Sequence, residues 1–157
     1  MIRSIVILAT IHEVQGLPGY LFAVEDPIYK TKIECIIRDC QIDFIFEEAS
    51  GYNPTTANRS AIAILGKASY FDLDVDRDLI TDLTPICDLK TLRVAEHLKR
   101  ERRWIEHVEG EVFERALLIC GVGHSLSVAS RLTAAGFNVQ LCQYLPYDLL
   151  CKRAHAN

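Results

Sequence analysis

The sequence predicts a single α/β domain with a mainly parallel β-sheet and helices on both faces. Two short segments, residues 4–9 and 116–120, are apolar throughout except for Ser4, which is typical of parallel strands that are buried on both faces. Helical patterns alternate with strand patterns along the chain, which is the element order of a parallel α/β sheet. The 157 residues, half of them hydrophobic, suffice for one core, and no repeat or linker divides them.

The first predicted strand, residues 4–9, ends at a polar segment that contains His12. A helical segment follows over residues 21–40, broken near Pro27 because proline removes a backbone donor. We expect its buried stripe to consist of Ile28, Ile33, Ile36 and Ile37.

The second predicted strand, residues 44–46, ends in two adjacent carboxylates, Glu47 and Glu48. Successive side chains of a strand point to opposite faces, so only one of the two glutamates can reach a given site. We expect the next helix to start at Thr55 or Thr56, to run through Ile64 and to be closed by Gly66.

A long amphipathic helix is predicted over residues 92–112, after a weak strand at residues 70–74 and an acidic loop at 76–78. Glu101 falls inside the apolar stripe of this helix, and a buried carboxylate needs a partner. We expect that partner to be Arg100 or another group of a site. The stripe is predicted to consist of Val94, Leu98, Ile105, Val108 and Val112.

The chain around residues 116–137 reads as a strand, a glycine turn and a helix, with a further strand at 138–144. Such a unit presents the polar residue of its turn, His124, at the carboxyl edge of a parallel sheet, where catalytic and ligating residues gather. The alternative is that His124 only caps the helix. The expected apolar stripe is Leu126, Ala129, Leu132 and Ala135, with Gly136 as the C-cap.

Composition excludes several classes of protein. The net charge of −4 argues against a nucleic-acid partner, and the basic cluster at residues 99–103 is interleaved with glutamates, as on a solvated helix. No run is long enough to span a membrane, and the N-terminal run lacks a cleavage pattern. The six cysteines have no metal-binding spacing and are expected to be reduced core residues of a cytoplasmic protein.

Several familiar motifs are incomplete. Gly16 stands where a zinc-peptidase helix needs its second histidine, and Leu126 replaces the third glycine of a dinucleotide-binding loop. Cys120 is expected to be a core residue and not a nucleophile. The alternating aspartates from Asp72 to Asp78 lack the glycine and glutamate of a calcium loop and are expected to form a solvated turn.

Three strand exits place polar side chains that can converge at one edge of the sheet: His12, one of Glu47 and Glu48, and His124. Two imidazoles and a carboxylate fit a divalent transition metal with open positions for water. Such a metal supports hydrolysis, because it lowers the pKa of bound water and polarises a carbonyl group. The alternative is that these residues only cap their strands.

The same segments resemble the TraB/Tiki and EreA/ChaN-like superfamily, and the resemblance covers most of residues 1–157. The matching segments are Ala9-Thr10-Ile11-His12, Phe44 to Glu48, Arg100-Glu101-Arg102-Arg103-Trp104 and Gly121-Val122-Gly123-His124. The resemblance implies a site of His12, His124 and a glutamate, bordered by Arg100 and Glu101. Tiki members are metal-dependent peptidases, EreA-like members hydrolyse esters, and ChaN-like members bind haem iron.

We therefore expect a metal-dependent hydrolase of a small-molecule or peptide substrate, with His12, Glu48, Arg100 and His124 as catalytic residues. The expected metal is manganese, zinc, cobalt or iron, with ligands drawn from His12, Glu47, Glu48 and His124. One alternative is acid–base catalysis without a metal. Others are a non-catalytic binder of metal or haem that could act as a homodimer, and a degenerate family member with a structural or regulatory role.

Overall fold

A computed structural model describes residues 2–15, 26–49, 54–74 and 89–146, with the backbone alone at residues 12, 13 and 89–93. The described residues form a five-stranded, all-parallel sheet with the strand order β3-β2-β4-β1-β5, which confirms the predicted α/β fold. The strands are β1 (Ser4–Thr10), β2 (Phe44–Glu47), β3 (Tyr70–Asp72), β4 (Arg115–Gly121) and β5 (Asn138–Gln143). The helices are α1 (Pro27–Asp39), α2 (Thr56–Ile64), α3 (Leu89–Gly110) and α4 (Val122–Ala134), with short 3₁₀ turns η1 (His12–Gln15) and η2 (Lys67–Ser69).

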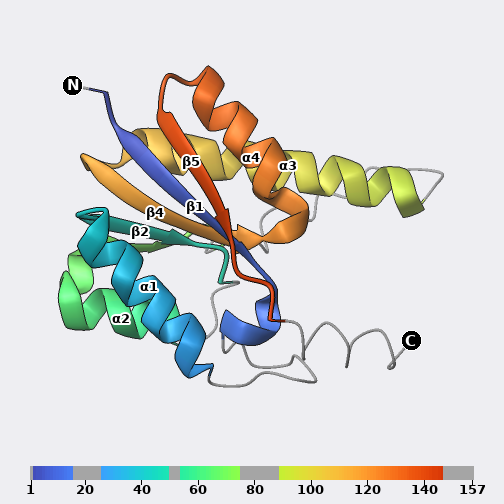
Figure 1. Ribbon diagram of the computed structural model, residues 1–157. Coiled ribbons are helices and arrows are strands. Elements are labelled where there is room, and N and C mark those ends of the chain that lie inside the picture. Colours follow the sequence, from blue (N-terminus) through green and yellow to red (C-terminus); the bar gives the residue numbers. More distant parts are fainter. Residues whose placement is uncertain (1, 16–25, 50–53, 75–88, 147–157) are drawn as a thin grey trace.

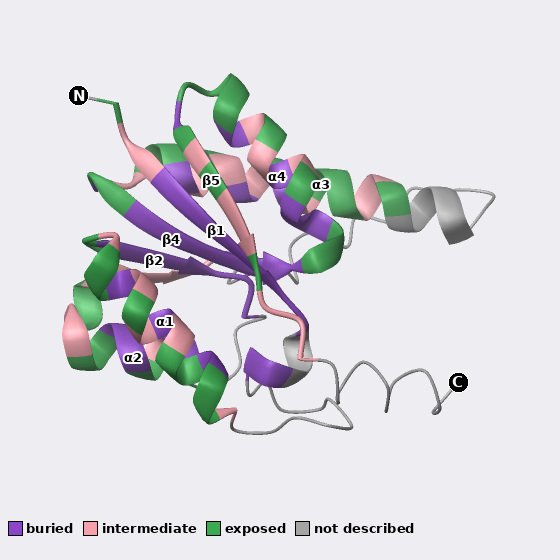
Figure 2. Cartoon of the chain, in the orientation of Figure 1, coloured by how far each residue is buried: buried purple, intermediate pink, exposed green. Residues whose placement is uncertain are grey.

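Helices cover both faces of the sheet, α1 and α2 on one side and α3 and α4 on the other (Figure 1). The alternation along β1 divides its side chains between the two layers. Ile5 and Ile7 pack in the same core as Trp104 and Val128, whereas Val6 and Leu8 pack with α1 and α2. The central strands are therefore buried on both faces, as Figure 2 shows, and this explains their unbroken apolar sequence.

Helix ends follow local signals in the sequence. The carboxylate of Asp26 caps α1 by accepting hydrogen bonds from the backbone N–H groups of Ile28 and Tyr29, at 2.9 and 3.1 Å. The Thr55 hydroxyl caps α2 by accepting from Asn58 N at 3.0 Å. The helix expected from residue 21 begins, among the described residues, at Pro27, which fits the first turn because it needs no donor.

The predicted face of α3 is partly wrong. Val94 and Leu98 are 54% and 45% exposed, and Val112 lies beyond the helix end and is 94% exposed. The buried side contains Val108 and Glu101, as predicted, together with Trp104, which the predicted stripe did not include. Large aromatic side chains dominate burial, so Trp104 fixes which side of the helix faces the sheet.

Similar corrections apply to α1 and α4. Ile28 is 68% exposed because it occupies the first turn of α1, outside the packed stripe. Leu126 is 73% exposed, because residues spaced by three drift around a helix, which places Leu126 about 120° from the buried Leu132. The residues that α4 buries are His124, Ser125, Val128 and Leu132.

The cysteine prediction is only partly correct. Cys120 is buried, Cys40 and Cys142 are half-buried, and Cys35 is exposed on α1. Cys87, Cys151, the loop at residues 76–78 and the C-terminal segment from residue 147 lie outside the described residues. Among the described helices, none is both long enough and apolar enough to cross a membrane.

A pair of valines near the end of α3 tests the corrected packing. Val108→Ala should lower the free energy of unfolding by about 2 kcal/mol, because Val108 is fully buried. Val112→Ala should change it by less than about 0.5 kcal/mol. Urea denaturation of both variants measures the difference, and equal losses would contradict this placement of the helix.

Candidate functional site

Glu48 lies at the carboxyl edge of the sheet, directly after β2. Its backbone N–H donates to Ile119 O at 2.9 Å, so the residue stays beside β4. Its carboxylate is 2% exposed and accepts from Gly121 N at 2.7 Å through one oxygen, and from Arg100 Nη2 at 2.7 Å through the other. Glu48 therefore joins β2, β4 and α3 at one point.

Arg100 reaches this edge from α3 and is held by a second carboxylate. Its Nη2 and Nε donate to Asp74 at 2.6 and 3.3 Å, and the Trp104 indole N–H donates to the same carboxylate at 3.0 Å. The guanidinium also lies 5.1 Å from the Trp104 ring centre. Two anions and an indole thus fix the orientation of Arg100, and the pKa of Arg100 is raised despite its partial burial.

Glu101 and His124 form a second buried pair next to Arg100. His124 Nδ1 lies 2.9 Å from Glu101 Oε1, and both side chains are less than a tenth exposed. The other oxygen of Glu101 accepts from the Ser127 hydroxyl at 2.5 Å and lies 3.4 Å from Arg131 Nε. A carboxylate on Nδ1 fixes that nitrogen as the donor, which leaves Nε2 of a neutral imidazole as an acceptor.

The two groups meet through His124, whose Nε2 lies 3.8 Å from Glu48 Oε1. The Trp104 ring packs edge-on against the imidazole at 5.0 Å, and the exposed His97 ring lies 4.6 Å away. Desolvation lowers the pKa of His97, and His124 and Arg100 lower it further. Glu48, Arg100 and His124 were all predicted as site residues, and the fold brings all three together.

His12 belongs to the same edge by its backbone. It opens η1 two residues after Thr10, which pairs with Gly121 at the end of β4. Its side chain lies outside the described part of the structure. Whether it reaches His124 stays a prediction.

Glu47 points to the opposite face, as strand alternation predicts. Its carboxylate is fully buried and accepts hydrogen bonds from Gln15 Nε2 at 3.0 Å, from Tyr70 OH at 2.8 Å and from the Thr55 hydroxyl. Burial raises the pKa of Glu47 to about 7, although these three donors oppose the shift. The same burial, together with Glu47, raises the pKa of Tyr70. The structure therefore brings Glu48, and not Glu47, to His124.

The described side chains alone do not make up a transition-metal site. Glu48 Oε1 and His124 Nε2 face each other, but both oxygens of Glu48 already accept hydrogen bonds, one of them from a guanidinium. Among the described residues no group of three metal-binding side chains is suitably placed. A third ligand would have to come from outside this set, and the sequence assigns that role to His12.

Sequence reasoning missed several contributors to the site. Asp74 was expected in a solvated turn, which is wrong, since it is 3% exposed and paired with Arg100. The available signal was weak: Asp74 lies two residues past β3, a strand of three residues that pairs with β2. The partner of Glu101 is the site histidine and not Arg100. Ser127 and Arg131 carried no signal, because serine and arginine are common on exposed helix faces.

The thiol of Cys120 is a poor nucleophile in this setting. Burial raises its pKa well above the ordinary value, and Glu48 and Glu101 add to the effect. The expectation that Cys120 is a core residue is confirmed.

Comparisons with known proteins add no identification. No protein-family model matches the sequence, and no curated protein matches it. The resemblance to the TraB/Tiki and EreA/ChaN-like superfamily therefore stays a prediction from short motifs.

The role of Asp74 can be tested by stability. Asp74→Asn removes the charge that holds Arg100 and should lower the free energy of unfolding by about 3 kcal/mol, because it leaves a buried guanidinium partly unpaired. Asp39→Asn, on the exposed end of α1, should be nearly neutral. Denaturant unfolding of both proteins provides the comparison, and a neutral Asp74→Asn variant would refute the assignment.

The buried Glu47 should make stability depend on pH. The folded protein raises its pKa from the ordinary 4.5 to about 7, so the folded state holds this proton more tightly than the unfolded chain. The stabilisation is complete below pH 4.5 and is lost as the pH rises to 7, which amounts to about 3 kcal/mol.

Glu47→Gln should therefore gain stability relative to the wild type between pH 5 and pH 8, since the amide stays neutral. Urea unfolding at each pH gives the difference. Glu114→Gln, at an exposed position, should show no such trend. A difference in the free energy of unfolding between Glu47→Gln and the wild type that does not change with pH would contradict the raised pKa of Glu47.

Proposed function

We propose that the protein is a hydrolase of ester or amide bonds whose reaction takes place at the carboxyl edge of the sheet. The observation that supports this most strongly is the buried Glu101–His124 pair, which leaves His124 Nε2 directed at the Glu48–Arg100 cluster. A histidine oriented by a carboxylate is a common device for moving protons between water, substrate and leaving group. The resemblance of the motifs supports the same class of reaction.

His124 acts as the general base in this proposal. Its Nε2 takes a proton from a water molecule as the water oxygen forms a bond to the substrate carbonyl carbon. The same proton then passes to the leaving oxygen or nitrogen as its bond to carbon breaks. Glu101 stabilises the imidazolium between these two steps, and Ser127 and Arg131 hold Glu101 in position.

Arg100 supplies the positive charge that the developing oxyanion requires. Among the described residues its hydrogen bonds use Nε and Nη2, so Nη1 remains to donate to the substrate. Its carboxylate partners hold the guanidinium in place before substrate binds, and such prior ordering reduces the cost of catalysis. Glu48 in turn fixes Arg100 and lies within reach of the His124 imidazole.

A metal-dependent form of this reaction is the second candidate, favoured by the facing donors Glu48 Oε1 and His124 Nε2. Manganese, zinc, cobalt or iron would supply an acidic bound water. This form requires His12 as a ligand. It is separated from the metal-free form by metal analysis of the purified protein and by activity after chelation.

Hydrolysis of p-nitrophenyl acetate and of a peptide p-nitroanilide tests the proposal. His124→Ala should lower kcat/KM by about 100-fold or more, because it removes the proton acceptor. Glu101→Gln should lower it by at least about tenfold, because the amide neither fixes the imidazole nor balances its charge. Unchanged hydrolysis in His124→Ala would reject the site.

Glu106→Gln is the matched control for Glu101→Gln. It lies on the same helix, is exposed and pairs only with a surface arginine among the described residues. Its kcat/KM should equal that of the wild type. Circular dichroism and thermal unfolding of each variant check that lost activity does not reflect lost structure.

A further inference from the structure

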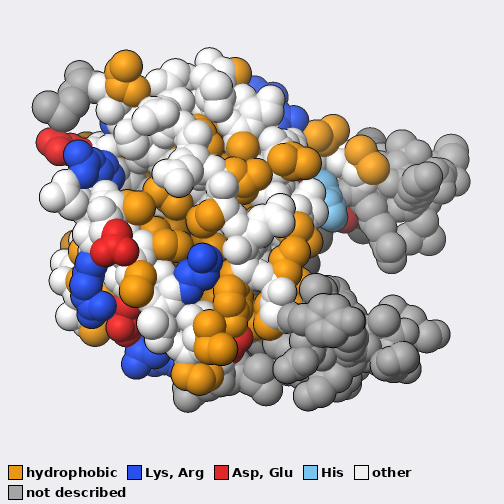
Figure 3. Space-filling view, in the orientation of Figure 1, with side chains coloured by type: hydrophobic (Ala, Val, Ile, Leu, Met, Phe, Trp, Pro, Cys, Tyr) orange, Lys and Arg blue, Asp and Glu red, His pale blue; other side chains and the backbone are white. Residues whose placement is uncertain are grey.

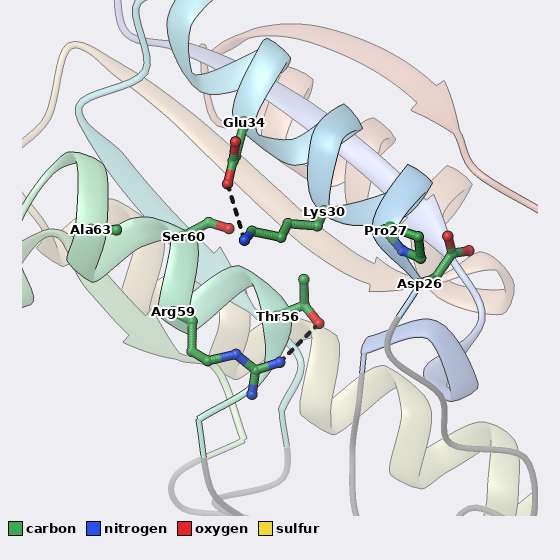
Figure 4. A pocket seen from close by; sticks show the side chains of 8 residues that line it. All are labelled: Asp26, Pro27, Lys30, Glu34, Thr56, Arg59, Ser60 and Ala63. Atoms are coloured by element: carbon green, nitrogen blue, oxygen red, sulfur yellow. Dashed lines mark hydrogen bonds and ion pairs between the residues drawn. The ribbon is translucent and has the colours of Figure 1, made fainter.

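A groove of about 650 Å³ lies between α1 and α2 (Figure 4). These two helices cover the face of the sheet opposite to the candidate site (Figure 1). Its volume is in the range of small-molecule sites, which is about 300–1,000 Å³. Helix α1 contributes Lys30 and Glu34 to its walls, and α2 contributes Arg59 and Ser60. Lysine, arginine and acidic side chains are interspersed over this side of the molecule, as Figure 3 shows.

The hydroxyl of Ser60 is the anomalous group in this groove. Ser60 is 2% exposed, and its Oγ has no hydrogen-bond partner among the described residues. A helical serine commonly satisfies its hydroxyl by donating to the carbonyl four residues before it, and Ser60 does not do so. A buried hydroxyl without a partner destabilises a fold. The unpaired hydroxyl of Ser60 is explained if an atom of a bound ligand forms the hydrogen bond.

Lys30 is available to move toward such a ligand. Its ammonium lies 3.9 Å from Glu34 Oε1, which is the outer limit of an ion pair, and its side chain is 60% exposed. Glu34 has a second cationic partner, Arg38 Nη2, at 3.6 Å. Lys30 can therefore move away from Glu34 while Arg38 still balances the negative charge of Glu34. In Figure 4 the side chains of Lys30 and Ser60 extend into the groove from the two helices.

Arg59 places a second positive charge at the groove. Its Nη1 donates to Pro54 O at 2.8 Å, and its Nη2 donates to Thr56 Oγ1 at 3.4 Å, so the guanidinium is held beside the first turn of α2 (Figure 4). The carboxylate of Asp26 also lines the groove. It already accepts hydrogen bonds from the start of α1 and from Tyr144 OH at 2.6 Å, and therefore does not need a ligand.

We propose that this groove binds a small molecule through an oxyanion group, a phosphate or a carboxylate, held by Lys30, Arg59 and the hydroxyl of Ser60. Charge-assisted hydrogen bonds from a lysine and an arginine suit either group. Glu34, beside Lys30, suits a hydrogen-bond donor on the same ligand. The proposal is independent of the hydrolase proposal, because the two sites lie on opposite faces of the sheet and share no residue.

Titration of the ¹⁵N-labelled protein with inorganic phosphate, and separately with acetate, tests the site at constant ionic strength set with chloride. Saturable shifts of the amide signals of Ser60 and Arg59 with at least one of the two anions are expected. Saturation with phosphate alone or with acetate alone identifies the preferred oxyanion. Shifts that do not saturate with either anion would overturn the proposal.

Two variants separate a binding role from a structural one. Lys30→Gln and Ser60→Ala should each weaken binding by about tenfold, because each removes a hydrogen bond to a charged group. Ser60→Ala should also raise the urea midpoint of the free protein, since it removes an unpaired buried hydroxyl.

Lys99→Gln and Ser130→Ala, at exposed positions on α3 and α4, are the matched controls and should bind as the wild type does. Equal affinity in Lys30→Gln, Ser60→Ala and these controls would refute the assignment of the groove.

Discussion

The carboxylate of Glu48 is the interaction on which the carboxyl edge of the sheet depends. One oxygen bonds the backbone of Gly121 and the other bonds Arg100, so a single side chain connects two strands and a helix. Gly121 is also the residue from which α4 starts, so the same bond fixes the direction in which α4 leaves the sheet. The spacing between His124 and Glu48 follows from this arrangement. Without Glu48, Arg100 would still pair with Asp74 beside β3, but it would lose its connection to the ends of β2 and β4.

Burial makes this network more than a set of surface ion pairs. Exposed ion pairs contribute little to stability, whereas a buried charge without its partner is strongly destabilising. Glu48, Asp74 and Glu101 are each at most 3% exposed, and each is bonded to a cation or imidazole from another element. The polar cluster therefore specifies how α3 packs on the sheet. It also keeps these side chains in fixed positions, which proton transfer requires.

Much of the fold follows from patterns that are local in the sequence. The unbroken runs of β1 and β4, the glycine turn before His124 and the capping threonine of α2 each determine structure within a few residues. The buried face of α3 does not follow from a local pattern, because it depends on how Trp104 packs against strands that are distant in the sequence. The prediction that Glu101 is buried was nevertheless correct, since the fixed rotation per residue of an α-helix places Glu101 on the same side as Val108.

The site was predictable to the extent that parallel strands share one carboxyl edge. That rule brought Glu48 and His124 together although 76 positions separate them. It could not identify Asp74, which follows a three-residue strand too short to be distinctive. It also could not identify Ser127 and Arg131, whose role depends on the packing of α3 against α4. A sequence pattern cannot predict contacts of this kind, because they depend on the distance between two packed helices.

The two adjacent glutamates at the end of β2 have a consequence for how the chain tolerates change. A shift of β2 by one residue would exchange the two faces. A shift in one direction would bring Glu47 to the guanidinium of Arg100 and Phe46 among Thr55, Tyr70 and Gln15. A shift in the other direction would place Glu48 among those three residues, with no cation, and Ala49 beside Arg100. Single-residue insertions or deletions in this strand are therefore opposed on both sides of the sheet at once. We therefore expect β2 to tolerate substitutions better than changes in its number of residues.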